Sequence, residues 1–147
     1  MPHNHEWLTR IKSVEREYLA IRQAAGRFQH AARVVPTILI DNLRHADIVD
    51  ASQNLEGTYL IRLFAVFETG VRQYWETRRK AKPKTVDLLN GVAARCRIPD
   101  VHRVDAHLVR DYRNSLVHER EDGIKALPIA DARRYLCRFF GHLPPQW

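Results

Sequence analysis

The residues best suited to chemistry in this 147-residue chain form one short run, Arg113-Asn114-Ser115-Leu116-Val117-His118. Arginine is always charged, and its planar guanidinium group can hold two phosphate oxygens at once. Histidine titrates near neutrality, so its imidazole can accept or donate a proton at physiological pH. These are the two groups that a metal-free ribonuclease needs. The run therefore predicts an RNA-cleaving site with Arg113 and His118 as its catalytic residues.

Each residue of the predicted site has an expected role. His118 is expected to deprotonate the ribose 2′-OH or to protonate the leaving 5′-oxygen, while Arg113 stabilises the charge that builds on the scissile phosphate. Asn114 is expected to orient the histidine or to hold a phosphate oxygen. Asp111 and Glu68 are expected to support the site, by fixing a tautomer or positioning an arginine. Attack by the 2′-OH would leave a 2′,3′-cyclic phosphate and would not cleave DNA.

The run ends a predicted helix over residues 101–119. At 100° per residue, one face of this helix is apolar, with Val101, Leu108, Tyr112 and Leu116. A second stripe, roughly 60° wide, is polar and holds His107, Asp111, Asn114 and His118, with Arg103 and Arg110 beside it.

Arg113 lies roughly 140° from His118 on an ideal helix, so the two side chains cannot meet within one straight helix. Either the last turn bends, or a second copy of the helix brings both pairs into one cleft. We favour a homodimer with this helix near its two-fold axis.

The first helix is predicted from a long apolar stripe that ends at Pro36. Its members recur at spacings of four and three: Trp7, Ile11, Val14, Tyr18, Ile21, Ala25, Phe28, Ala32 and Val35. A stripe of this length predicts coiled-coil-like packing against another helix, and a second subunit is one source of that helix.

The pattern over residues 36–54 fits a strand, a helix or a loop, and its structure is left open. A second helix is predicted from about Leu55 to Arg79, with its core face formed by Leu60, Leu63, Phe64, Phe67, Val71, Tyr74 and Trp75. Basic residues follow it. Arg78, Arg79 and Lys80, together with Arg103 and Arg110, are candidate RNA contacts, although such a run also fits a solvated loop.

Shorter elements complete the chain. Thr85 is the predicted N-cap of a helix that ends before Pro99, Asp122-Gly123 marks a turn, and Pro128 opens a last helix. The inward side of that last helix is predicted to carry Ala132, Tyr135, Leu136, Phe139 and Phe140. The pattern predicts an all-α, antiparallel bundle of about five helices, forming a single domain over residues 1–147.

The chain carries a net charge of +7, which favours an anionic partner and RNA first, although a general enrichment in arginine would give the same charge. No apolar run is long enough to predict a membrane span, and the N-terminus lacks the pattern of a signal peptide, so we expect a cytoplasmic protein. Cys96 and Cys137 show no paired spacing, and the histidines lack zinc spacing. We therefore expect neither a disulfide, a metal site nor a cofactor.

Arg113-Asn114-Ser115-Leu116-Val117-His118 resembles the Arg-x(4–6)-His signature of HEPN domains, in its Arg-Asn-x-x-x-His form. Residues 55–64 with Phe67-Glu68 resemble the core helix that precedes this signature. The resemblance extends over residues 5–141, with the six-residue motif as its specific part. It implies a compact helical bundle, usually dimeric. In many members it also implies a metal-independent endoribonuclease of toxin–antitoxin, CRISPR or phage-defence systems.

Two other expectations stand beside this one. Some HEPN proteins have lost catalysis and serve as RNA-binding or protein-interaction modules, which is the rival function for this chain. HEPN toxins with minimal nucleotidyltransferase antitoxins commonly carry tyrosine two places after the motif histidine, where this chain has Arg120. That departure argues against membership of the group of toxins paired with such antitoxins. Another antitoxin or protein partner remains an open alternative. A structural alternative also stays open, in which Arg113 is an ordinary surface residue and His118 a helix-end histidine favoured by the helix dipole.

Overall fold

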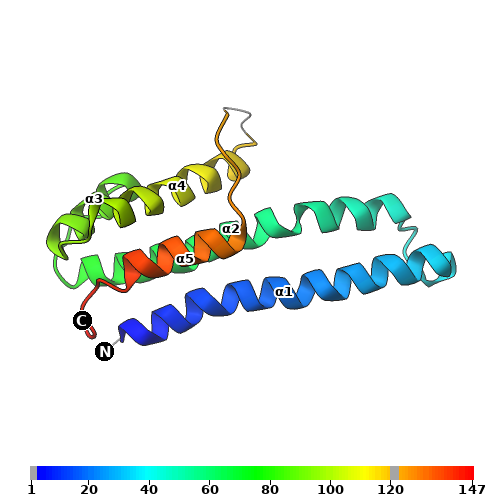
Figure 1. Cartoon of the computed structure of the whole chain (residues 1–147), viewed down its shortest axis with the longest axis horizontal. Coiled ribbons are helices and arrows are strands. Elements are labelled where there is room, and N and C mark those ends of the chain that lie inside the picture. The colour runs from blue at the N-terminus through cyan, green and yellow to red at the C-terminus, as the bar shows by residue number, and fades with distance from the viewer. Residues whose placement is uncertain (1–2, 120–122) are drawn as a thin grey trace.

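Five α-helices make up the structure, a computed structural model that describes residues 3–119 and 123–147. Figure 1 shows α1 (Asn4–Val34), α2 (His45–Glu76), α3 (Thr85–Arg95), α4 (Asp100–Val117) and α5 (Ile129–Phe140); a 3₁₀ helix, η1, follows α1 at Pro36–Ile38. The predicted all-α bundle of about five helices is confirmed. The predictions that concern Arg120 and Asp122 fall outside the described residues.

The helix α2 begins ten residues earlier than the apolar pattern predicts. The open stretch over residues 36–54 contains η1, a connection and the first turns of α2. Asp47 fixes this start, because its carboxylate accepts a hydrogen bond of 2.8 Å from the backbone N–H of Arg44, which would otherwise have no partner. Hydrophobic periodicity could not reveal these turns, since no side chain between His45 and Tyr59 is buried.

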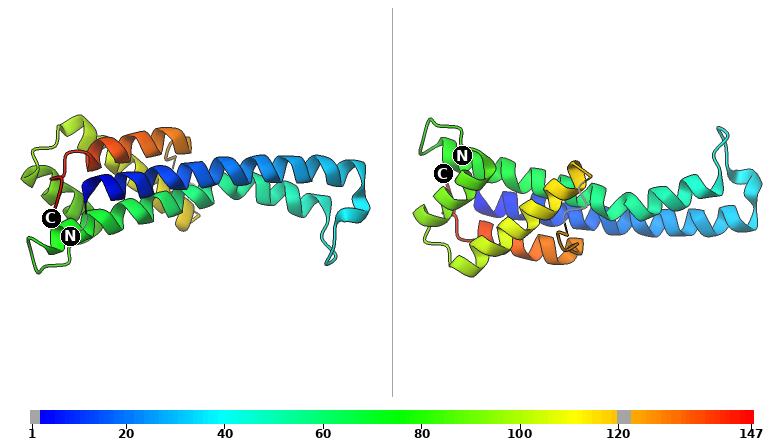
Figure 2. Two further views of the ribbon diagram at one scale, coloured as in Figure 1. Left: turned by 90° about the horizontal axis from the view of Figure 1, so that it is seen from below. Right: turned by 90° about the horizontal axis from the view of Figure 1, so that it is seen from above.

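Half of the α1–α2 pair projects beyond the rest of the molecule. The other helices cover the first half of α1 and the second half of α2, and all three views show the remaining halves extending alone (Figures 1 and 2). We call residues 19–55 the arm. The structure describes the arm in full, and Ala32 is its one buried residue. The apolar stripe of α1 continues through Ile21 and Phe28, but its burial stops at Tyr18 and resumes only at Ala32.

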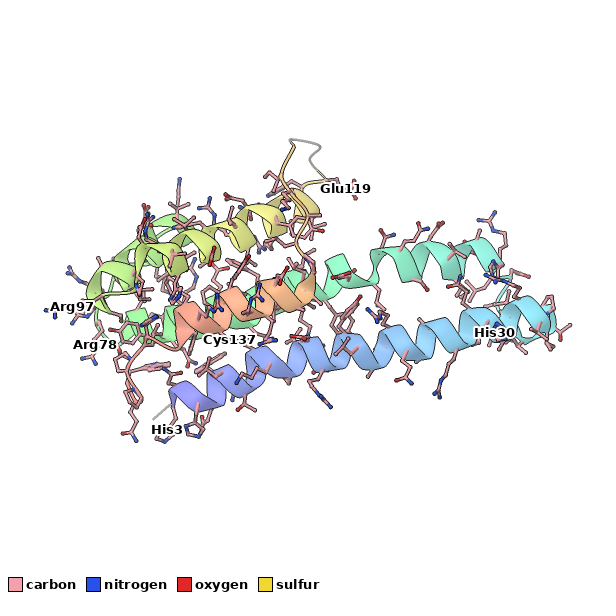
Figure 3. All side chains as sticks on the ribbon, viewed as in Figure 1. His3, His30, Arg78, Arg97, Glu119 and Cys137 are labelled. Atoms are coloured by element: carbon pink, nitrogen blue, oxygen red, sulfur yellow. The ribbon has the colours of Figure 1, made fainter. Side chains whose placement is uncertain are left out.

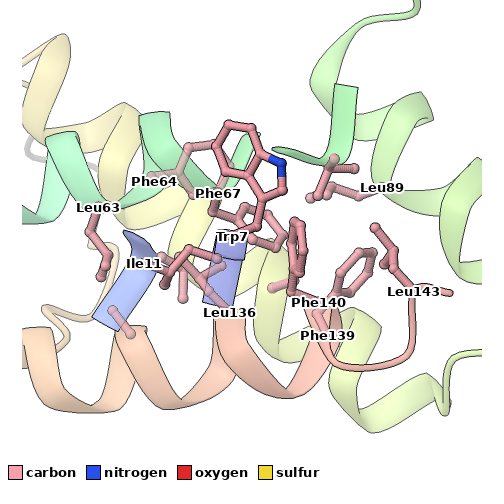
Figure 4. Close-up of a cluster of buried hydrophobic side chains, with 14 of the residues drawn as sticks. Trp7, Ile11, Leu63, Phe64, Phe67, Leu89, Leu136, Phe139, Phe140 and Leu143 are labelled. Atoms are coloured by element: carbon pink, nitrogen blue, oxygen red, sulfur yellow. The ribbon is translucent and has the colours of Figure 1, made fainter. Parts of the chain in front are cut away.

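The core lies where α5 crosses the covered parts of α1 and α2 (Figure 4). The Phe67 ring meets the Phe139 ring edge-on, with centroids 5.6 Å apart, and the Phe140 ring at 6.2 Å. Trp7 and Ile11 of α1 complete the cluster. Each edge-on aromatic pair contributes about 0.5–1.5 kcal/mol beyond the burial of its area. The inward residues predicted for α5 are buried, except Tyr135, which is half-buried.

The predicted capping role of Thr85 is wrong. Thr85 is the first residue of α3, and Lys84 occupies the N-cap position without a side-chain hydrogen bond. The Thr85 hydroxyl instead donates a hydrogen bond of 2.8 Å to Oε1 of Glu68. This bond ties the start of α3 to α2, a contact between distant segments that a local capping pattern cannot reveal.

The predicted apolar face of α4 is also wrong in part. The buried face centres on Ala106 and Val109, roughly 90° around the helix from the predicted one. Val101 and Leu108 are 61% and 47% exposed, while Tyr112 and Leu116 are half-buried. The rotation follows from packing, because α4 contacts α2, α3 and α5, and small residues allow the close approach. It leaves a line of apolar side chains on the uncovered side, namely Val101, Val104 and Leu108.

The C-terminal tail closes the end of the bundle opposite the arm. Asn4 Nδ2 donates a hydrogen bond of 2.7 Å to the Leu143 carbonyl oxygen, and Trp147 packs edge-on against Tyr74. The two termini therefore lie side by side (Figure 1). In the part of the chain described here, no helix combines the length and the apolar character needed to span a membrane.

Replacing Gly70 with alanine tests the core. The new Cβ would lie 2.8 Å from Phe140 Cε2 and 2.9 Å from Trp7 Cδ2, and both rings are buried. Overpacking of this kind costs about 1–3 kcal/mol, more than the roughly 1 kcal/mol that alanine adds to helix propensity. We expect Gly70→Ala to lower the free energy of unfolding, measured by urea denaturation.

The matched control is Gly26→Ala, because nothing lies within 4 Å of the added Cβ. This change should raise the free energy of unfolding by about 0.5–1 kcal/mol. Equal effects at the two positions would contradict the packing described for Gly70.

Candidate functional site

The end of α4 rests on α2, and this contact positions the Arg-Asn-x-x-x-His motif. A Cβ on Gly57 of α2 would lie only 3.4 Å from Leu116 Cδ2, so the two helices come close at this point. The helix ends at Val117, and His118 is its C-cap. The motif therefore occupies the last turn of a helix that is held on its inner side and open on its outer side.

Arg113 lies on the inner side of α4, where it faces α2. Its guanidinium carbon is 5.6 Å from the centroid of the Phe64 ring, a distance at which cation and ring attract each other. Its Nη1 donates a hydrogen bond of 2.9 Å to Oδ1 of Asn114. Its Nε is buried and has no hydrogen-bond partner among the described residues. The guanidinium group is therefore held in place by the Phe64 ring and Asn114, while its buried Nε–H lacks a partner among the described residues, which costs stability.

His118 is exposed and one helical turn beyond Asn114. Its backbone N–H donates a hydrogen bond of 3.0 Å to the Asn114 carbonyl oxygen. Side chains at this spacing have Cβ atoms about 5–6 Å apart. Among the described residues, no hydrogen bond joins Arg113 to His118. Asn114 thus stands between them, because its side chain binds the guanidinium group and its own turn carries the imidazole.

The remaining predicted residues of α4 are occupied by partners within the chain. Arg110 forms an ion pair with Asp111, and its Nε donates a hydrogen bond of 3.1 Å to that carboxylate. Arg103 binds Asp100 at 2.6 Å and also donates a hydrogen bond of 3.1 Å to the side-chain oxygen of Asn90. Both predicted RNA-binding arginines are therefore partly neutralised, although Nη1 of Arg110 is buried without a partner in the described part of the chain.

His107 lies among these arginines. Its Nε2 is 2.8 Å from the side-chain oxygen of Asn90. Burial lowers the pKa of His107, and the charges of Arg110 and Arg103 lower it further, while Asp111 opposes the shift. The imidazole of His107 is thus kept neutral at physiological pH, unlike a group that binds phosphate through its charge.

Glu68 lies in a separate cluster between α2 and α3. It accepts hydrogen bonds from Arg72 at 2.6 Å and from Thr85 at 2.8 Å, and none of its hydrogen bonds reaches Arg113 or His118. Its partner Arg72 was missed at the sequence level, although the spacing of four residues on one helix was the available signal. The described contacts make Glu68 a link between helices, and its supporting role in catalysis stays a prediction.

The basic run after α2 lies far from the motif. Arg78, Arg79 and Lys80 are exposed. Figure 3 places Arg78 at one end of the molecule, far from Glu119, the residue that follows His118 and lies near the middle of the molecule's length. The structure does not bring this run together with Arg113.

A cavity of about 590 Å³ adjoins the motif, where the end of α4 meets α2. Its lining includes Tyr112 and Glu119 of the α4 end and Glu56 of α2, and none of its described lining residues is basic. Asn114 lies on the other side of α4, roughly 160° from Tyr112. A phosphate group would therefore approach Arg113 from the Asn114 side and not through this cavity.

Comparison of the chain with protein-family models, curated proteins and solved structures found no match. The HEPN resemblance of the motif stays a prediction from the sequence. Within residues 3–119 and 123–147, no three histidine, cysteine, aspartate or glutamate side chains form a group that could hold a metal ion.

The lowered pKa of His107 makes stability depend on pH. Below the ordinary histidine pKa of about 6.5, the unfolded chain binds a proton more readily than the folded one. The contribution of neutral His107 to the free energy of unfolding is therefore fully present above that pH. It is lost as the pH falls toward and through the pKa of His107 in the folded state. In the unmodified protein, the free energy of unfolding should fall between neutral and acidic pH. We expect this fall to be smaller in His107→Gln, measured by urea denaturation at each pH. His30→Gln, at an exposed position in the arm, is the control.

An NMR titration checks the pKa itself. Arg110→Gln should raise the pKa of His107, because it removes one of the two charges that lower it. A His107 that titrates at or above the ordinary value in the unmodified protein would contradict this account.

Proposed function

We propose that this protein is a metal-independent endoribonuclease whose site consists of Arg113, Asn114 and His118. The hydrogen bond from Arg113 to Asn114 supports the proposal most directly. It draws the guanidinium group toward the turn that carries His118, so a single phosphodiester could contact both residues. The +7 net charge supports an RNA substrate, because a basic protein attracts the phosphate backbone without reading its sequence.

The proposed reaction assigns one step to each group. His118 is exposed, so it can reach the ribose 2′-OH and accept its proton as the 2′-oxygen attacks phosphorus. Arg113 donates to the phosphate oxygens on which negative charge builds, and Asn114 holds the guanidinium group in position. The leaving 5′-oxygen takes a proton, and the products are a 2′,3′-cyclic phosphate and a 5′-hydroxyl.

A homodimer completes the proposal. The uncovered side of α4 carries the apolar line of Val101, Val104 and Leu108, beside the stripe that includes Asp111 and His118. A second copy that crosses this side would bury the line and supply a second histidine, so that one imidazole acts as base and the other as acid. The HEPN resemblance, which implies a dimer, agrees with this arrangement.

The same resemblance supports a biological role. We infer a cytoplasmic toxin or antiphage-defence effector that acts on RNA and is restrained by an antitoxin or another protein partner. This inference rests on the six-residue motif.

Cleavage of labelled single-stranded RNA in the presence of EDTA tests the proposed chemistry. Arg113→Ala and His118→Ala should each lower the rate by about 100-fold or more, which is the usual contribution of a general base or a charge-stabilising donor. Arg27→Ala and His30→Ala are matched controls in the exposed arm and should cleave as the unmodified protein does.

The products provide a second readout. RNA with a 2′-deoxy sugar at the cleaved position should resist cleavage, and the normal product should carry a 2′,3′-cyclic phosphate. Equal cleavage by all variants, or cleavage of the deoxy substrate, contradicts the proposed function.

The arm supports a second candidate function, a protein-interaction module without chemistry. A groove of about 380 Å³ runs between α1 and α2 and is lined almost wholly by apolar side chains, among them Ile21, Phe28 and Leu55. Four arginines and three aspartates leave the arm nearly neutral within a chain of charge +7. A second copy can therefore approach arm against arm with little repulsion, and two such helix pairs would complete a four-helix bundle.

Light scattering after size-exclusion chromatography separates the two assemblies. If the dimer forms across α4, Leu108→Glu should convert it to a monomer, because a carboxylate would be buried without a partner. Phe28→Glu should leave the dimer intact. The opposite pattern would contradict dimerisation across α4 and support the interaction module.

A further inference from the structure

A second basic site lies at the end of the molecule that carries the termini. A cavity of about 600 Å³ opens between the ends of α2, α3 and α5. Arg78 enters it from the end of α2, Arg95 and Arg97 from the end of α3, and His142 from the tail after α5. Figure 3 shows Arg78 and Arg97 at this same end. None of the described residues that line the cavity carries a carboxylate.

The arginines of this cavity differ from the seven ion-paired arginines of the chain. Seven arginines elsewhere form ion pairs with aspartate or glutamate: Arg44, Arg62, Arg72, Arg103, Arg110, Arg133 and Arg134. Within residues 3–119 and 123–147, no ion pair involves Arg78, Arg95 or Arg97. Three guanidinium charges therefore face one cavity without an acidic partner among the described residues, and an external anion would supply the missing charge.

The backbone at Arg97 supports a role for its side chain. Arg97 has a φ of +52° and follows the C-cap of α3, where the N–H of Ile98 closes the helix end by donating to the Ala93 carbonyl oxygen at 2.9 Å. Glycine is the usual residue in this left-handed position, because other residues are strained there. An arginine at this position keeps its charge in the cavity at a cost in stability.

Uncharged donors line the same cavity. The Cys96 thiol donates to the Tyr74 hydroxyl oxygen, with 3.3 Å between sulfur and oxygen, and both residues line the cavity. Burial raises the pKa of Tyr74, so this hydroxyl stays protonated at neutral pH. His142 pairs with His102 of α4 at 3.0 Å on the rim.

Helix dipoles alone do not account for this charge. Cations are favoured near helix C-termini, and three such ends meet here. Each end carries about half a negative charge, so three ends offset only about half of the three guanidinium charges. The excess remains available to a ligand.

We propose that this cavity binds a phosphate monoester, carried by the end of an RNA strand. A terminal phosphate carries a charge of about −1.5 to −2 at neutral pH, which suits three arginines better than the single charge of a phosphodiester. The cavity volume falls within the range of small-ligand sites, about 300–1,000 Å³, so it can hold a terminal nucleotide. The RNA as carrier rests on the proposed function, whereas the phosphate chemistry does not.

Fluorescence anisotropy tests the site with two labelled single-stranded RNAs that differ only in a 5′-phosphate or a 5′-hydroxyl. The measurements use the His118→Ala protein in EDTA, so that the probes stay intact. The phosphorylated RNA should bind about tenfold more tightly or better, as expected for hydrogen bonds to a charged group. Arg95→Gln and Arg97→Gly should each remove most of this preference, and Arg97→Gly should also relieve the backbone strain. Arg16→Gln and Arg27→Gln, at exposed positions of α1, should not change it.

Equal affinity for the two RNAs, or a preference that survives both cavity substitutions, would overturn the proposal. Competition with adenosine monophosphate identifies the carrier. If adenosine monophosphate displaces the labelled RNA at concentrations similar to those at which unlabelled phosphorylated RNA does, the ligand of the site is a free nucleotide. If it displaces the labelled RNA only at much higher concentrations, the ligand is the end of an RNA strand. The two proposals can fail separately. If the unmodified protein does not cleave RNA, but its preference for the phosphorylated RNA is lost in Arg95→Gln and Arg97→Gly, the proposed function is contradicted and the phosphate site is supported.

Discussion

The aromatic face of α2 is the constraint on which the rest of the structure depends. Phe67 packs against α5, while Phe64, three residues earlier along the chain, lies beneath the guanidinium group of Arg113 in α4. One helix face thus forms the core and supports the candidate site. Because these rings are fully buried, α4 has one position on α2, and that position turns Arg113 inward and leaves His118 exposed.

The distribution of paired and unpaired arginines follows from the same packing. Helices that lie side by side bring acidic residues to Arg62, Arg72 and Arg133, and these pairs join helices or turns of one helix. Near the C-terminal ends of α2 and α3, the described contacts include no such partner for Arg78, Arg95 or Arg97, and positive charge collects there. The two regions proposed to bind phosphate therefore lie near opposite ends of α4, which is about 27 Å long.

Sequence periodicity predicted the helices that bury a continuous apolar face. It mispredicted helix starts and faces where the buried residues are few or only weakly apolar. The pattern of α5 gave its inward residues correctly except for the half-buried Tyr135, because one face of that helix meets the core along its whole length. The start of α2 was missed because the arm buries almost nothing. The face of α4 was misplaced because its buried residues include Ala106 and Ser115, which are weak hydrophobic signals in a sequence. The motif itself was visible in the sequence, whereas its link through Asn114 and the gathering of Arg78 with Arg97 required the fold.

The central claim is that Arg113 and His118 contact the same RNA phosphate. The most direct measurement follows the ring-proton NMR signals of His118 while RNA with a 2′-deoxy sugar, which cannot be cleaved, is added. The account predicts that these signals shift on binding in the unmodified protein and shift far less in Arg113→Ala, although the His30 signals stay unchanged in both. RNA binding that leaves the His118 signals where they were, or that shifts them equally without Arg113, would contradict it.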